Sequence, residues 1–131
     1  MLSYNIFLDD ERPMDKTTWV TFPEGMWVVA RNFEDFVSTI EAMGLPEFIS
    51  FDHDLADEHY QEGAKSNYTQ FNYDNITEKT GMCCAKWLIE YCIDHDLDPP
   101  KWQCHTKNPC GADNINGLLK NYAEFRSKRW R

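Results

Sequence analysis

The sequence is short of positive charge and has no long apolar run, and these two absences exclude several classes of protein. Thirteen Lys and Arg residues stand against 22 Asp and Glu, a formal net charge of −9. Such a surface repels phosphate backbones, so we expect no extended nucleic-acid surface. No apolar stretch approaches the roughly 20 residues of a membrane span, and the amino terminus lacks the basic region and apolar core of a signal peptide. We expect a cytoplasmic protein without membrane contact.

The cysteines have neither the number nor the spacing of a disulfide framework or a zinc ribbon. There are five, an odd set with one adjacent pair and no C-x-x-C: Cys83, Cys84, Cys92, Cys104 and Cys110. Disulfide scaffolds and zinc ribbons need paired, regularly spaced cysteines. We therefore interpret them as small buried hydrophobes. The alternative is a thiolate site built with His105.

What is present is a regular alternation of strand-type and helix-type segments over 131 residues, without repeats or low-complexity tracts. Continuous apolar runs predict buried strands at 4–8, 26–30, 47–51 and 101–105. Apolar residues at helical spacing predict helices that begin after the capping residues Asn32 and Thr80, and a last helix over about 112–126. The first two helices are expected to end at Met43 and near Leu97. The length is that of a single domain, residues 1–131.

The alternation predicts an α/β fold: a three-layer sandwich with a short parallel sheet of about four strands and helices on both faces. The all-apolar "IFL" indicates that the first strand is central, which gives the order 2-1-3-4. Right-handed crossovers are then expected to place the 32–43 helix on one face and the 80–97 helix on the other.

Ionisable side chains follow every predicted strand. They are Asp9, Asp10 and Glu11, then Arg31, then Asp52, His53 and Asp54, then His105 and Lys107. One such cluster is typical of a solvated loop or a helix cap, but four at one sheet edge are hard to explain as caps. In open parallel sheets, ligands bind at the carboxyl ends of the strands beside a topological switch point. The sequence therefore predicts a site at this edge.

These motifs carry a resemblance to a known family. "NIFLDDERP" and "FISFDHDL" resemble the acidic corner of response-regulator receiver domains, whose fold is flavodoxin-like. Together with "VARNFEDF", "TG" before a helix and "HTKNPCGADNI", they resemble the cyclic-phosphate processing receiver-like domain, for which a role in handling cyclic phosphate ends has been proposed. The resemblance covers nearly the whole chain.

The resemblance implies roles for particular residues. It puts Asp9 and Asp10 in the acidic pair and Asp52 in the receiver acceptor position. It places four further residues in the motifs of this branch: His53, Asp54, His105 and Asn108. Ordinary receivers have an additional strand that ends in a Lys-Pro pair. Here "KNP" follows His105 directly, which leaves open whether Lys107 fills that role.

Converging carboxylates repel one another, and a hard divalent cation would keep them ionised. We expect Mg²⁺ or Mn²⁺ on Asp10 and Asp52, with Asp9 and Asp54 in support. His105 is the preferred general acid or base because imidazole moves protons near neutral pH. His53 is a further catalytic candidate, or equally a hydrogen-bonded core histidine.

Two arginines stand where an anion would meet this cation. Arg12 and Arg31 can bind phosphate oxygens bidentately, although pairing with the surplus carboxylates is the favoured alternative for Arg31. Asn108 opens a loop and helix whose free N–H groups suit a phosphate. The 56–79 segment is expected to be a long loop or lid, since structureless loops of that length are usually functional or disordered. Its aromatic residues could stack on a base, or pin the segment to the body, which we favour.

The leading hypothesis is a metal-dependent phosphoesterase, a hydrolase, or a phosphotransferase, whose partner is a phosphate-containing small molecule or an RNA terminus. One alternative is a phospho-accepting switch with Asp52 as nucleophile. The other is a non-catalytic module that binds a nucleotide. A fold-level resemblance cannot choose among them.

Overall fold

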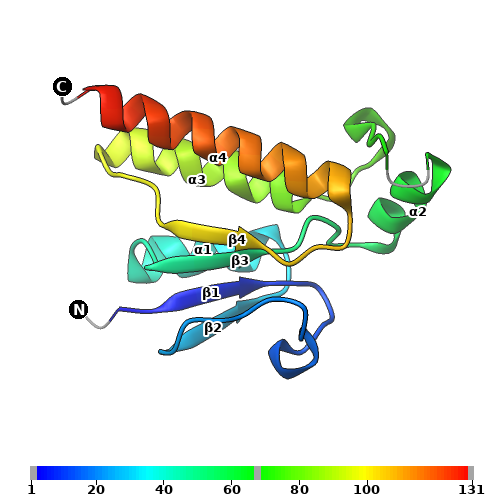
Figure 1. The fold of residues 1–131 in the computed structure, drawn as a ribbon, viewed down its shortest axis with the longest axis horizontal. Helices are drawn as coiled ribbons and strands as arrows, with labels where there is room; N and C mark the ends of the chain where they lie inside the picture. Colours follow the sequence, from blue (N-terminus) through cyan, green and yellow to red (C-terminus); the bar gives the residue numbers. More distant parts are fainter. Residues whose placement is uncertain (1–2, 67–68, 130–131) are drawn as a thin grey trace.

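A computed structural model describes residues 3–66 and 69–129, and its centre is a sheet of four parallel strands (Figure 1). The strands are β1 (Asn5–Leu8), β2 (Trp27–Ala30), β3 (Phe48–Phe51) and β4 (Lys101–Cys104). Their order is β2-β1-β3-β4, which confirms the expected 2-1-3-4 arrangement. All four residues of β1 are buried, as a strand covered on both faces requires. The described residues contain no fifth strand.

The expected caps define the first two long helices. The Asn32 side chain accepts a hydrogen bond from the Asp35 N–H at the start of α1 (Phe33–Met43), and Thr80 accepts one from the Cys83 N–H at the start of α3 (Gly81–His95). Helix α4 spans Pro109–Arg129 and is longer than the predicted 112–126. It begins earlier because Asn108 Oδ1 accepts a hydrogen bond from the Gly111 N–H.

The helices do not divide between the two faces, and this part of the prediction is wrong. Helix α1 contacts α3, α3 contacts α4, and their apolar residues join those of the strands in one core. In the order β2-β1-β3-β4, the steps from β2 to β3 and from β3 to β4 run in the same direction across the sheet. Two right-handed crossovers that run in the same direction place their helices, here α1 and α3, on the same face of the sheet.

Irregular chain packs on part of the opposite face, where it forms the third layer in place of helices. The β1–β2 connection contains only a short 3-10 helix, η1 (Met14–Lys16). Within this connection the Phe22 ring packs 5.7 Å from that of Phe7, whose side chain points away from the helices and is fully buried. A connection without a long helix therefore shields Phe7 on this face of the sheet.

The 56–79 segment, expected to be a loop or lid, is folded in part. It forms α2 (Asp57–Lys65) and η2 (Tyr73–Asn75) beyond the carboxyl ends of the strands (Figure 1). Phe71 and Tyr73 pack edge-on against the His53 ring, while Tyr68 lies outside the described residues. These contacts agree with pinning to the body. None of the described helices has the length and apolar character needed to cross a membrane.

Candidate metal and phosphate site at the carboxyl edge of the sheet

Strand register brings three residues together. Leu8, Phe51 and Cys104 are aligned across β1, β3 and β4, so the next residues along are Asp9, Asp52 and His105. Two backbone hydrogen bonds extend the ladder by one residue, from Asp52 N to Leu8 O at 2.9 Å and from His105 N to Phe51 O at 2.9 Å.

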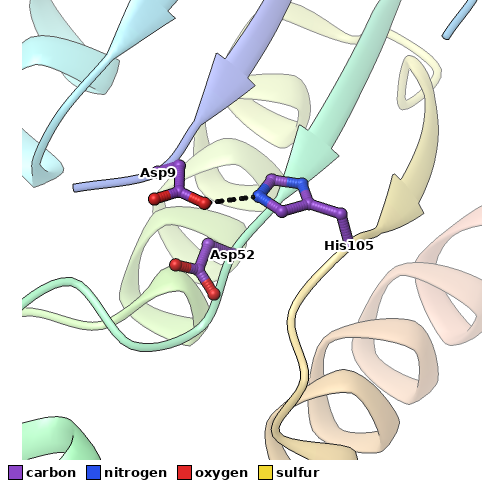
Figure 2. A group of neighbouring side chains, drawn as sticks. All are labelled: Asp9, Asp52 and His105. Atoms are coloured by element: carbon purple, nitrogen blue, oxygen red, sulfur yellow. Dashed lines mark hydrogen bonds and ion pairs between the residues drawn. The ribbon is translucent and has the colours of Figure 1, made fainter. Parts of the chain in front are cut away.

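Successive side chains of a strand point to opposite faces of the sheet, so these three side chains lie on one face. Leu8 and Phe51 belong to the core under the helices, and the following side chains turn to the face that the β1–β2 connection covers. One ligand atom from each of Asp9, Asp52 and His105 lies within 4.8 Å of the others, and all three residues are buried. Figure 2 shows the three side chains turned toward one another from the ends of their strands. We call them the Asp9–Asp52–His105 cluster.

Asp9 is fully buried, and both of its carboxylate oxygens have hydrogen-bond partners. Its Oδ1 accepts hydrogen bonds from the backbone N–H groups of Glu11 at 3.0 Å and Arg12 at 2.8 Å. Its Oδ2 lies 2.9 Å from His105 Nε2. Burial alone would raise the pKa of Asp9, but the bonds from His105 and the two N–H groups outweigh it and lower the pKa.

Asp52 is in the opposite situation. Its Oδ1 accepts from the His53 N–H at 2.9 Å, but no donor in the described residues meets its buried Oδ2 with hydrogen-bond geometry. The Arg12 guanidinium is 3.6 Å from that oxygen. Burial, followed by the charge of Asp9, raises the pKa of Asp52 to about 8, although Arg12 and the nearby Thr106 act to lower it. A buried carboxylate oxygen that accepts no hydrogen bond and lies beside a second carboxylate is a position that a cation would stabilise.

His105 is held from both sides. Its Nδ1 lies 2.7 Å from Ser50 Oγ, which accepts a further hydrogen bond from Gln103 Nε2 at 3.1 Å. The imidazole is stacked on the Phe7 ring at 4.6 Å and is fully buried. With Nε2 on Asp9, both ring nitrogens have protein partners, so the ring is fixed with Nε2 toward the two carboxylates.

A small cavity of about 170 Å³ opens beside the cluster. It is lined by Asp52, Asp54, Arg12, Tyr60, Thr106, Lys107 and Asn108. Asp9 and His105 are not among its lining residues. The lining of the cavity therefore combines two carboxylates, Asp52 and Asp54, with two cationic side chains, Arg12 and Lys107, and this combination suits a metal-bound anion.

Asp10, expected as a principal ligand, does not join the cluster, because alternation turns it away from Asp9. Its Oδ1 instead accepts a hydrogen bond from the Tyr60 hydroxyl at 3.2 Å. Burial and the neighbouring charge of Asp9 raise the pKa of Asp10. Asp10 therefore lies at the boundary of the site, next to α2.

Asp54 and His53 form a separate polar group under α4, because the chain bends after Asp52. His53 Nδ1 lies 2.7 Å from Asp54 Oδ1, and its Nε2 lies 2.9 Å from the Tyr73 hydroxyl. Asn108 Nδ2 donates to Asp54 Oδ1 at 3.2 Å. A Cβ on Gly111 would stand 2.3 Å from the His53 ring, so this glycine lets α4 pack on it. His53 is thus a hydrogen-bonded core histidine.

The two arginines differ in placement. Arg12 lines the cavity and reaches both cluster carboxylates, with Nη1 3.4 Å from Asp9 Oδ2. Arg31 Nη1 donates to the backbone carbonyls of Asp9 at 3.1 Å and Arg12 at 3.0 Å. It binds the β1–β2 connection rather than the cavity or the surplus carboxylates.

Sequence reasoning missed Ser50, Gln103 and Trp19. A buried serine within the apolar run "EFISF" is a signal that could have indicated a polar partner, and Ser50 is fully buried. Trp19, whose Nε1 donates to the His105 carbonyl at 2.7 Å, lies in an irregular connection where no periodicity marks it.

A parallel sheet with acidic residues just after its two central strands defines a receiver-like α/β domain. The family model of the cyclic-phosphate processing receiver domain matches residues 4–121, and the chain belongs to this family. It is therefore a receiver-like domain associated with cyclic-phosphate processing. No curated protein and no solved structure matches the chain.

Proposed function

We propose that the chain is a metal-dependent phosphoesterase or phosphotransferase that acts on a cyclic phosphate of a nucleotide or an RNA end. The observation that carries the proposal is the Asp9–Asp52–His105 cluster, in which Asp52 Oδ2 accepts no hydrogen bond, beside a cavity lined by Arg12 and Lys107. Carboxylates supply the hard oxygen ligands that Mg²⁺ and Mn²⁺ prefer, and an imidazole suits Mn²⁺ as well.

Asp9 and Asp52 would hold the cation, and His105 would be its third protein ligand. When bound, such a cation polarises a phosphoryl oxygen and lowers the pKa of water. Arg12 and Lys107 would bind the remaining phosphoryl oxygens and neutralise charge that grows as the bond to phosphorus forms. Ser50 and Phe7 keep the imidazole in place, which favours a ligand-holding role for His105 over proton transfer to a leaving group.

Ring opening of a cyclic phosphate needs no reactant besides water. A water oxygen bonds to phosphorus, one ester P–O bond breaks, and the proton that the water loses is gained by the released alcohol oxygen. The product is a linear phosphomonoester, so substrate and product differ by one water.

The test is incubation of the protein with cyclic nucleotides and with oligonucleotides ending in a 2′,3′-cyclic phosphate, with and without Mg²⁺ or Mn²⁺. Mass spectrometry of nucleotide and protein follows. We expect linear products only with metal, and their loss in Asp52→Asn but not in the exposed control Asp94→Asn. A phosphorylated protein without new nucleotide products would instead indicate the switch, and an unchanged but retained ligand would indicate the binding module.

A further inference from the structure

Trp19 is a large aromatic side chain left partly in solvent at the edge of the cavity. Its exposed fraction is 42%, although an indole is among the most costly side chains to expose. It belongs to the β1–β2 connection and lies against two residues that line the cavity. The Lys107 Nζ stands 4.1 Å from the centre of the ring, and the Arg12 Cζ stands 5.5 Å from it.

The indole is also fixed in orientation. Its Nε1–H donates to the His105 carbonyl at 2.7 Å, which ties the ring to the end of β4 directly beside the cluster. A fixed ring loses little conformational freedom when a ligand stacks on it. Lys107 is exposed and carries a long flexible side chain, so its ammonium can leave the ring for a phosphate at little cost.

The size of the cavity supports a ligand that extends beyond it. A volume of about 170 Å³ is below the roughly 300–1,000 Å³ of sites that enclose a whole small molecule. It accommodates a phosphate and part of an attached ring. Any further group must lie outside the cavity, and Trp19 offers an aromatic ring in contact with both cations.

We propose that Trp19 is a stacking platform for a nucleobase, which makes this site selective for nucleoside cyclic phosphates over cyclic phosphates that lack a base. The inference rests on the proposed function, because it assumes a phosphate between Arg12 and Lys107. Stacking of a base on an aromatic side chain changes affinity by roughly 5- to 150-fold. It tolerates any base, so Trp19 selects for the presence of a base and not for its identity.

The experiment compares two probes by calorimetry in Mn²⁺, cytidine 2′,3′-cyclic monophosphate and the base-free glycerol 1,2-cyclic phosphate. Trp19→Leu should weaken cytidine probe binding at least 5-fold and leave the glycerol probe within 2-fold. Trp19→Phe should retain most of the affinity for the cytidine probe. Both variants lose the indole hydrogen bond, so their difference reports the aromatic face. Phe125→Leu, at an exposed aromatic on α4, is the control.

Equal weakening of both probes by Trp19→Leu, or of neither, would overturn the inference, as would equal affinity of the parent for the two probes. If the parent binds neither probe, the proposed function itself fails. An RNA end and a free nucleotide present the same base and phosphate. Comparing a dinucleotide that ends in a cyclic phosphate with the mononucleotide shows whether the protein prefers an RNA end or a free nucleotide. Weaker binding of either ligand by Trp19→Leu supports the inference.

Discussion

Ser50 is a buried hydroxyl between two polar side chains, and it fixes the direction in which His105 points. His105 Nε2 faces the Asp9 carboxylate, which can only accept, so without a cation Nε2 carries the proton and Ser50 donates its hydroxyl to Nδ1. A cation on Nε2 would take the place of that proton, and Nδ1–H would then donate to Ser50 Oγ. We expect Ser50→Ala to weaken metal binding by about 10- to 100-fold, the usual effect of losing the partner that orients a metal-site histidine. The measurement is Mn²⁺ titration followed by thermal shift.

The control for this prediction is the exposed Ser38→Ala on α1, which should leave the titration unchanged. Ser50→Thr keeps a hydroxyl and should restore most of the affinity. The nitrogen shifts of the His105 ring should move in Ser50→Ala and return in Ser50→Thr. An unchanged metal affinity in Ser50→Ala would show that the hydroxyl has only a structural role.

Gly111 and Gly117 lie on the same helix and should respond to alanine in opposite ways. An added Cβ at Gly111 would stand 2.3 Å from the His53 ring, whereas one at Gly117 has nothing within 4 Å. Gly111→Ala should lower the free energy of unfolding by about 1–3 kcal/mol through overpacking. Gly117→Ala should raise it by about 0.5–1 kcal/mol because alanine is the better helix former. Urea unfolding measures both, and equal effects would contradict the proposed packing.

At the scale of elements, His59 ties α2 to the end of the 56–79 segment. Its Nδ1 accepts from the Leu55 N–H at 2.8 Å, so its Nε2 carries the proton and donates to the Glu78 carbonyl at 2.9 Å. A neutral ring is needed for this arrangement, and burial lowers the pKa of His59. Its contribution to stability is therefore present above the unfolded value of about 6.5 and is lost as the pH falls below it.

We predict that the free energy of unfolding of the metal-free parent protein loses the His59 contribution between pH 7.5 and 5.5. The His59→Gln variant has no imidazole at this position, so this loss should be missing from its pH profile. Asp52, with its raised pKa, gains stability as the pH falls through the same range. The quantity to compare is therefore the free energy of unfolding in urea, measured at each pH, of the variant minus that of the parent. His95→Gln, at an exposed histidine of α3, should match the parent. A His59→Gln profile parallel to that of the parent would refute the assignment.

At the scale of the whole molecule, a cation at the cluster would join the ends of β1, β3 and β4. A ligand that binds only the folded state stabilises it, by about 2.7 kcal/mol at a concentration 100 times the dissociation constant. Millimolar Mg²⁺ or Mn²⁺ should therefore raise the melting temperature of the parent. Asp52→Asn should abolish this response and should raise the melting temperature in EDTA, since it removes a carboxyl group whose ionisation is opposed by burial and by the charge of Asp9.

Asp10→Asn separates the two possible ligand sets. The structure turns Asp10 toward Tyr60, so this variant should keep most of the metal response. If Asp10→Asn abolishes the response while Asp9→Asn keeps it, the cation is bound by Asp10 and Asp52, as the sequence alone suggested. If the parent shows no response to either metal, the carboxylates bind none.

The sequence by itself determined the four strands, the helices α1, α3 and α4, and the order in which the strands pair, but not α2 within the 56–79 segment. Local signals are sufficient for this: a wholly apolar "IFL" requires a strand covered on both faces, and Asn32 and Thr80 cap helices through contacts three residues away. The residue types at the carboxyl edge also follow from the sequence, because parallel strands all end there.

Only the tertiary structure decided which of these residues meet. Asp9 and Asp10 are neighbours of the same type, and the register of β1 with β3 selects Asp9, because one step along a strand reverses the side chain. His53 and His105 both follow strands, but the chain bends before His53 and its ring packs under α4, while β4 carries His105 to the cluster. Such choices depend on long-range pairing and on where each strand ends, and neither is encoded in a local pattern.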